Sequence, residues 1–123
     1  MKRFLILLLT ALLLTGCVSG SYVTKRSVAN QNSHSFSMRY NYFNGTKVYT
    51  INAKEENLAV KVDIQSDSGD LAITIAKDGE APAYTGNQIP TSSFTVYLKE
   101  PGKYTVTVTA QKHCGSFSLD WGK

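Results

Sequence analysis

The stretch PGKYTVTVTA, residues 101–110, decides the fold class. Large apolar side chains stand at every second position, at Tyr104, Val106 and Val108, and threonines fill the positions between them. An alternation with a period of two is typical of a half-buried β-strand, with Tyr104 on the face that turns toward the core. The Pro-Gly pair in front of it is a turn signal.

The same alternation recurs on both sides of this stretch. No segment after residue 17 shows helical spacing over a useful length. Turn signals separate the alternating runs, notably Asn44-Gly45, the polar run Ser66 to Asp70 and His113-Cys114-Gly115. The pattern predicts an all-β protein, an antiparallel β-sandwich or jelly roll of about seven strands. The predicted strands cover residues 36–42, 47–52, 58–65, 71–75, 94–99, 104–110 and 117–121.

The amino-terminal segment has the layout of a signal peptide. Lys2 and Arg3 precede an apolar run over residues 4–14. Eleven residues are too few for a helix that crosses a bilayer core of about 30 Å. The segment is therefore expected to direct export, with residues 1–16 forming the signal peptide.

The sequence Leu14-Thr15-Gly16-Cys17 resembles the lipobox of bacterial lipoproteins. The resemblance implies cleavage before Cys17, attachment of a diacylglyceryl group to its thiol and acylation of the new amino terminus with a fatty acid such as palmitate. It also implies an extracytoplasmic protein of the cell envelope, anchored by lipid to the cell membrane or the outer membrane. An ordinary secretory signal with an incidental cysteine is the alternative. The polar residues 17–32 are expected to form a flexible tether, and residues 33–123 the folded domain.

The formal net charge of +4 does not belong to the predicted domain. All nine acidic residues and nine of the thirteen basic residues lie from Ser33 onward. A near-neutral domain lacks the basic face that contacts nucleic-acid phosphates, so no nucleic-acid partner is expected.

Five motifs in the run from about Tyr40 to Trp121 resemble the bacterial pre-peptidase C-terminal domain and its jelly-roll relatives, and they occur in that family's order. The resemblance implies a non-catalytic module. Some collagen-binding relatives hold calcium, but Ala72 stands where they carry a second acid after Gly-Asp-Leu. We therefore expect no cofactor; calcium is possible but not favoured. The motifs are Tyr49-Thr50-Ile51, Ser68-Gly69-Asp70-Leu71, Ser93-Phe94-Thr95-Val96, Pro101 to Val108 and Gly115-Ser116-Phe117-Ser118-Leu119.

Cysteine and histidine give no catalytic or metal-binding pattern. If Cys17 is lipidated, Cys114 has no partner within the chain, which leaves a free thiol, an intermolecular bridge or a buried small apolar residue. Adjacent residues of a strand point to opposite faces, so His113 is not expected to serve Cys114 as a base. His34 shows no zinc-ligand spacing with either residue. Paired carboxylates near a histidine and nucleophile motifs are also absent, so the chain is not expected to be an enzyme.

The candidate binding residues lie late in the chain. The turn-rich gap Asp78 to Thr91 is longer than a usual hairpin loop, and within it Tyr84 and Asn87 could stack on a ligand and hydrogen-bond to it. The alternative is that Tyr84 and Ile89 close the edge of the core. Tyr97 lies on the polar side of its strand, either as an anchor for a ligand or as an ordinary strand-forming residue.

Acidic residues gather around two predicted turns. Turn oxygens are the ligands that calcium prefers, but no Asp-x-Asp-x-Asp loop is present and acids in turns are usually solvated, so no metal site is expected. The residues are Asp63, Asp67, Asp70, Asp78 and Glu80.

Two function classes follow. The first is a membrane-anchored, extracytoplasmic binding or adhesion module for a carbohydrate or protein ligand. The second is a structural or accessory subunit that docks onto another envelope protein through a sheet edge or through Cys114. An exposed aromatic patch would favour the first class, and a flat apolar patch or a bare edge strand the second.

Overall fold

A computed structural model describes residues 21–122, and the prediction of an all-β antiparallel fold is confirmed. The strands are β1 (Tyr22–Lys25), β2 (Val28–Asn32), β3 (Ser35–Ala53), β4 (Leu58–Lys77), β5 (Pro82–Gly86), β6 (Ser92–Leu98) and β7 (Gly102–Asp120). All their pairings are antiparallel. In this part of the chain, no helix has the length and apolar character needed to cross a membrane.

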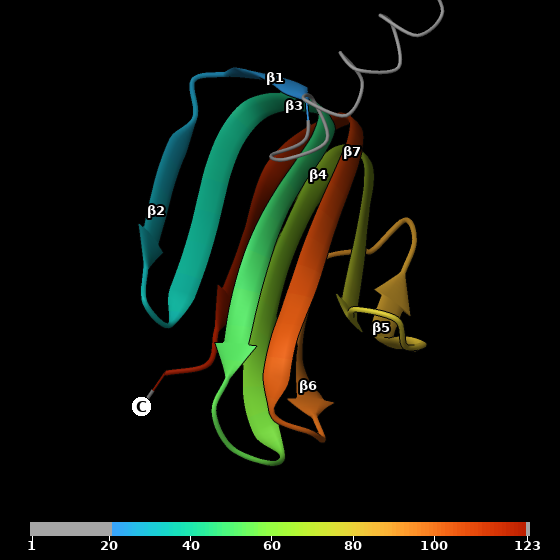
Figure 1. Cartoon of the computed structure of the whole chain (residues 1–123). Helices are drawn as coiled ribbons and strands as arrows, with labels where there is room; N and C mark the ends of the chain where they lie inside the picture. Colours follow the sequence, from blue (N-terminus) through green and yellow to red (C-terminus); the bar gives the residue numbers. More distant parts are fainter. Residues whose placement is uncertain (1–20, 123) are drawn as a thin grey trace, which may run out of the picture.

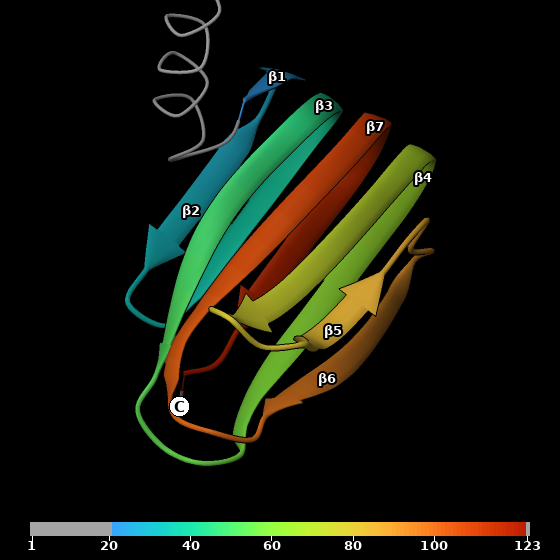
Figure 2. The ribbon, with the colours of Figure 1, turned by 45° about the vertical axis from the view of Figure 1, so that its right-hand side comes forward.

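Three long strands run through the whole molecule and bend in the middle. β3, β4 and β7 are 19, 20 and 19 residues long and lie side by side in the order β3-β7-β4. Figure 1 and Figure 2 show them arching over at one end, so that each strand belongs to two facing layers. Layer A contains β2, the first halves of β3 and β4, the second half of β7, and β6. Layer B contains β1, the other halves of the three long strands, and β5.

The core fills the space between the layers. The rings of Phe36 and Tyr49, from the two halves of β3, stack with their centroids 3.7 Å apart, and Phe117 packs edge-on against both rings. Aliphatic side chains of the three long strands supply most of the rest, because every second residue of each half-strand points inward. The fully buried aliphatic residues are Ile51, Val60, Val62, Leu71, Ile73, Ile75, Leu98, Val106, Val108 and Leu119.

The predicted turns at Asn44-Gly45, Ser66 to Asp70 and His113-Cys114-Gly115 are wrong. The structure has continuous strands there, with bulges where the register shifts between Tyr40 and Gly45 and between Ser66 and Asp70. Buried positions switch parity across each bulge, from Met38 and Tyr40 to Phe43 on β3. An extra residue bends a strand and keeps its inward face inward, which the fold needs where a strand passes from one layer to the other. We call this end of the molecule the bend: residues 40–45, 66–70 and 110–115.

Part of the segment expected to be a flexible tether is folded. β1 pairs with residues 42–45 of β3 and β2 pairs with residues 35–39, so both strands complete the β3 edge of the two layers. Tyr22 packs edge-on against Phe43, with ring centroids 5.8 Å apart, and the Nζ of Lys47 lies 4.6 Å from the centre of the Tyr22 ring. Cys17 and the expected signal peptide lie outside the described residues.

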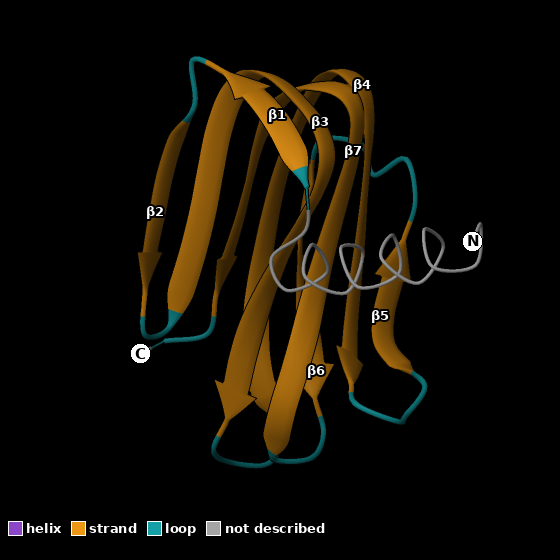
Figure 3. Ribbon diagram, turned by 45° about the horizontal axis from the view of Figure 1, so that its top comes forward, coloured by secondary structure: helices purple, strands orange, loops and turns teal. Residues whose placement is uncertain are grey.

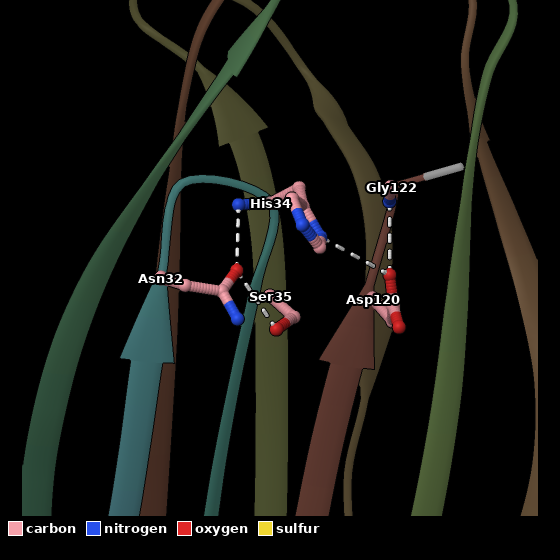
Figure 4. A network of polar contacts seen from close by, with 5 residues as sticks. All are labelled: Asn32, His34, Ser35, Asp120 and Gly122. Atoms are coloured by element: carbon pink, nitrogen blue, oxygen red, sulfur yellow. Dashed lines mark hydrogen bonds and ion pairs between the residues drawn. The ribbon is translucent and has the colours of Figure 1, made fainter.

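The end of the molecule opposite the bend is closed by polar contacts between the β2–β3 turn and the end of β7 (Figure 4). The Oδ1 atom of Asn32 accepts hydrogen bonds from the backbone N–H of His34 at 2.9 Å and from the Ser35 hydroxyl at 3.1 Å. The His34 Nδ1 atom lies 3.9 Å from the Asp120 carboxylate, and the Trp121 N–H donates to the His34 carbonyl at 2.9 Å. These contacts hold the chain's last strand against its first hairpin.

Candidate functional site

An open groove of about 370 Å³ lies between β5 and β6, at the end of the molecule opposite the bend. β5 begins there beside Ala76, β6 ends there beside Leu58, and β7 begins there at Gly102. We call it the distal groove. It is lined by Glu80, Ala81, Pro82, Ala83, Tyr97, Lys99, Glu100 and Tyr104.

Tyr97 is the accessible aromatic residue of the distal groove. Its side chain is 60% exposed, whereas its strand neighbours Val96 and Leu98 are buried, so the predicted outward orientation is confirmed. An exposed tyrosine presents a rigid apolar ring and a hydroxyl at a low cost in conformational entropy.

Lys77 lies beside the distal groove and contacts two carboxylates of its lining, those of Glu80 and Glu100. The Lys77 Nζ atom lies 3.4 Å from a Glu100 carboxylate oxygen and 3.7 Å from a Glu80 oxygen. Desolvation acts to lower the pKa of Lys77, but the hydrogen bond to Glu100 and the charges of both carboxylates outweigh it, so the pKa is raised. Lys77 therefore stays protonated and holds two acids of separate turns beside each other.

This arrangement suits binding rather than covalent chemistry. The distal groove combines one exposed ring with carboxylate oxygens and lysine side chains, which is the mixture of apolar surface and a few polar groups that small ligands meet in proteins. Neither Lys77 nor Glu100 was expected as a site residue from the sequence. No local signal marks them, because Lys77 ends β4 and Glu100 follows β6, and the two residues meet only in the folded sandwich.

The structure does not bring the three candidate residues together. Tyr84, on β5, is half-buried, and its ring lies 5.2 Å from that of Phe94 at the edge of the core. Burial raises the pKa of its hydroxyl. Ile89 is buried beside it, so both residues have the structural role that the sequence left as the alternative. Asn87 is exposed and lines a separate depression of about 350 Å³ near the bend, together with Asp70 and Gln111.

His113 is buried in the bend, with no exposed surface and a hydrogen bond at each ring nitrogen. Its Nδ1 atom lies 2.8 Å from the Tyr40 hydroxyl, and its Nε2 atom lies 2.8 Å from the Ser66 hydroxyl. Because the single Ser66 proton goes to the Ile89 carbonyl, the Ser66 oxygen accepts the proton of Nε2, and Nδ1 accepts from Tyr40. Desolvation lowers the pKa of His113, although Asp67 and Asp70 partly oppose it. This neutral, fully paired histidine ties the three long strands together.

The half-buried Cys114 carries a free thiol and lies one residue from this network. Within residues 21–122, His, Cys, Asp and Glu side chains form no group of three or more that could hold a metal ion. The acids considered for calcium are dispersed: Asp67 and Asp70 lie at the bend, and Asp63 accepts a hydrogen bond from Ser93 in layer A.

No protein-family model matches the chain, and no curated protein matches its sequence. Solved structures similar to it include PirA, at 12% identity and a TM-score of 0.47, over 76% of this chain and 96% of that chain. Another is PliG, a periplasmic inhibitor of g-type lysozyme from Aeromonas hydrophila, at 18% identity and a TM-score of 0.45, over 83% and 85% of the two chains. A third is TmCBM61 in complex with β-1,4-galactotriose, at 13% identity and a TM-score of 0.41, over 84% and 79%. Likenesses at this level carry no inference about ligand or activity.

Proposed function

We propose that the protein is a lipid-anchored, extracytoplasmic binding module that uses its distal groove to bind a carbohydrate or protein ligand of the cell envelope. The main support for this proposal is the position of that groove, with its exposed Tyr97, at the end of the sandwich opposite the bend. The Leu14-Thr15-Gly16-Cys17 motif supports the lipid anchor. The resemblance to the pre-peptidase C-terminal domain supports a non-catalytic role.

The anchor and the ligand-binding groove would lie at opposite ends of the molecule. β1, the first described strand, lies across the arch at the bend (Figure 3). A lipid on Cys17 would thus hold the bend end near the membrane, since only residues 18–21 separate Cys17 from β1. The distal groove would then face away from the membrane, where a ligand can reach it.

The test of ligand binding uses purified peptidoglycan and an array of immobilised oligosaccharides and envelope proteins. Tyr97→Ala removes the exposed ring and is expected to weaken binding about tenfold or more, the effect typical of an aromatic anchor residue. Thr50→Ala, on the outer face of layer B, is the matched control and should bind as the parent does. Equal binding by both variants would contradict the assignment of the groove.

The test of lipidation is independent of the ligand. Cells fed a fatty-acid probe should label the parent protein and leave Cys17→Ala unlabelled. Label on the Cys17→Ala protein would show that the lipid is attached elsewhere, or that the signal is not a lipobox.

One observation favours the second function class, an accessory subunit docked through a sheet edge. All five residues of β2 are exposed, and among the described strands β2 pairs only with β3, so its other edge is open for another strand. A photo-crosslinker at Ala29 should then capture one envelope protein in cells, and capture should be lost when a proline replaces Asn30 and blocks edge pairing.

A further inference from the structure

The exposed apolar residues of the molecule gather on its first two strands. Four large apolar side chains are exposed in the described part of the chain, and three of them, Tyr22, Val23 and Val28, lie on β1 and β2. Their exposed fractions are 40%, 59% and 52%. Together with Lys25 and Arg26 between them, we call these residues the β1–β2 patch.

All charged residues of the segment that contains β1, β2 and β3 are basic. Residues 18–54 contain Lys25, Arg26, Arg39, Lys47 and Lys54 and no acidic residue, so all nine acids of the protein follow residue 54. Asp67 and Asp70 are the acids of the bend, and they belong to β4, which is separated from β3 by β7. β1 and β3 therefore carry basic residues, and no acidic residue lies on β1, β2 or β3.

The basic side chains here rest on aromatic rings. The Lys25 Nζ atom lies 5.2 Å from the centre of the Tyr42 ring. The Lys47 Nζ atom lies over Tyr22 and donates a hydrogen bond to its hydroxyl at 3.0 Å. Tyrosine with lysine at the edge of an apolar patch is the combination found at membrane–water interfaces, where the ring lies at headgroup depth and the ammonium reaches the phosphates.

The chain length between the expected lipid and the patch keeps the two together. Tyr22 follows Cys17 by five residues, which span at most about 18 Å when fully extended. An anchored domain therefore holds Lys25 and Arg26 within a few Debye lengths of the headgroups, each Debye length being about 8 Å at physiological salt.

We infer that the β1–β2 patch docks on the anionic phospholipid headgroups of the leaflet that carries the lipid on Cys17, with Val23 at the interface and Lys25 and Arg26 on the phosphates. This inference rests on the proposed lipid anchor. Docking fixes the orientation of the domain and turns the distal groove away from the bilayer.

The experiment uses the full lipidated protein in vesicles of phosphatidylethanolamine with 30% phosphatidylglycerol, part of it brominated to quench nearby tryptophan. Val23→Trp places a reporter in the patch. The parent, whose single tryptophan Trp121 lies at the opposite end of the molecule, gives the background. The introduced tryptophan should be quenched and Trp121 should not. Quenching should fall in vesicles without phosphatidylglycerol and in 0.5 M salt.

Charge reversal provides the sharper comparison. Adding Lys25→Glu and Arg26→Glu should lower the docked population about tenfold or more, because each basic residue near an anionic surface contributes about a factor of five. Lys61→Glu with Lys103→Glu changes the net charge equally on exposed positions of β4 and β7, and should leave quenching unchanged. The proposal would be overturned if Lys25→Glu with Arg26→Glu left quenching unchanged. It would also be overturned if Lys61→Glu with Lys103→Glu lowered quenching by the same amount.

Other outcomes separate this inference from the proposed anchor and from self-association. A protein that does not sediment with vesicles at all has no lipid anchor, and the proposed function fails. A protein that sediments without quenching of the patch tryptophan is anchored but not docked, and only the inference fails. An unquenched patch tryptophan in a protein that crosslinks to itself within the vesicles would instead assign the patch to a second copy of the chain.

Discussion

Tyr104 and Tyr97 line the same groove but have opposite environments. Tyr104 is buried on the core face of β7, and its hydroxyl donates a hydrogen bond to the Glu100 carbonyl at 2.7 Å. The burial that the alternation predicted for Tyr104 is confirmed. Tyr97 points outward from β6. The alternation of each strand alone was enough to separate the two residues.

Truncation of the two tyrosines should therefore have unequal effects on stability. Tyr104→Ala leaves a cavity and an unpaired carbonyl, and should cost about 3–5 kcal/mol of unfolding free energy. Tyr97→Ala should cost about 1 kcal/mol or less, because its ring buries little surface. Urea denaturation of both variants measures the difference. A loss at Tyr97 equal to or above that at Tyr104 would contradict the assigned faces.

His113 makes the stability of the protein depend on pH. Its pKa is lowered in the folded state, whereas in the unfolded chain it is about 6.5. The unfolded state therefore binds the proton more readily, so the stability contributed by neutral His113 is fully present above about pH 6.5 and is lost as the pH falls from there toward the folded-state pKa. Below the folded-state pKa this contribution is gone.

Denaturant unfolding between pH 5 and pH 8 tests this dependence. The parent should lose stability as the pH drops below about 6.5, and His113→Asn should lack that part of the slope. His113→Asn should also cost about 1–3 kcal/mol at pH 8, because Tyr40 and Ser66 lose their partner. His34→Asn removes the other histidine, which is exposed, and should keep the slope. An unchanged slope in His113→Asn would show that another group titrates.

At the scale of the elements, the bulges let three strands pass from one layer to the other. Gly115 lies in the bend of β7 with a φ of 150°, and a Cβ there would collide with the Gln65 carbonyl of β4. Gly69 has a φ of 77°, and a Cβ there would collide with the Lys112 carbonyl of β7. Glycine is required at both positions because neighbouring backbones approach too closely for any side chain.

Alanine at Gly115 should therefore disturb the bend itself. Gly115→Ala adds a clash to an unfavourable φ and should cost about 3 kcal/mol or more. Gly79, in the β4–β5 turn, has a φ of 77° with open space around it, so Gly79→Ala should cost only the backbone strain of about 1–2 kcal/mol. Thermal unfolding of both variants separates the clash from the strain. Equal costs would mean that the strands move apart freely at the bend.

For the molecule as a whole, the continuity of β3, β4 and β7 removes any boundary between the two layers. Each long strand contributes inward residues to both layers, and the core cluster of buried residues is continuous. Neither layer can unfold without pulling the other half of its own strands out of the core, which favours a single cooperative transition.

Two probes should then report one unfolding transition. Trp121 lies at the end of β7 in layer A and packs against Phe36, with ring centroids 5.7 Å apart, so its fluorescence reports layer A. Far-UV circular dichroism reports the strands of both layers. The two urea midpoints should coincide, and two separated midpoints would show that the layers unfold independently.

The sequence by itself determined the all-β class and the inward or outward side of residues such as Tyr104 and Tyr97. These properties depend on the alternation of neighbouring residues within one strand, which can be read without knowing how that strand pairs. The expectations for Cys17 and the signal peptide come from local motifs as well, and remain predictions.

Only the tertiary structure decided how the strands connect. As a local sequence, Asn44-Gly45 is compatible with a hairpin turn and with a bulge in a continuous strand. Pairing with β1 and β7 selects the bulge. The hydrogen bond between Tyr40 and His113 joins residues 73 positions apart. β1 and β2 have little apolar pattern of their own, and they are ordered by pairing with β3. The distal groove likewise exists only because the β4–β5 turn lies beside the end of β6. Alternation records which way a side chain points, but the partner of each strand is set by contacts between distant residues, which no short stretch of sequence contains.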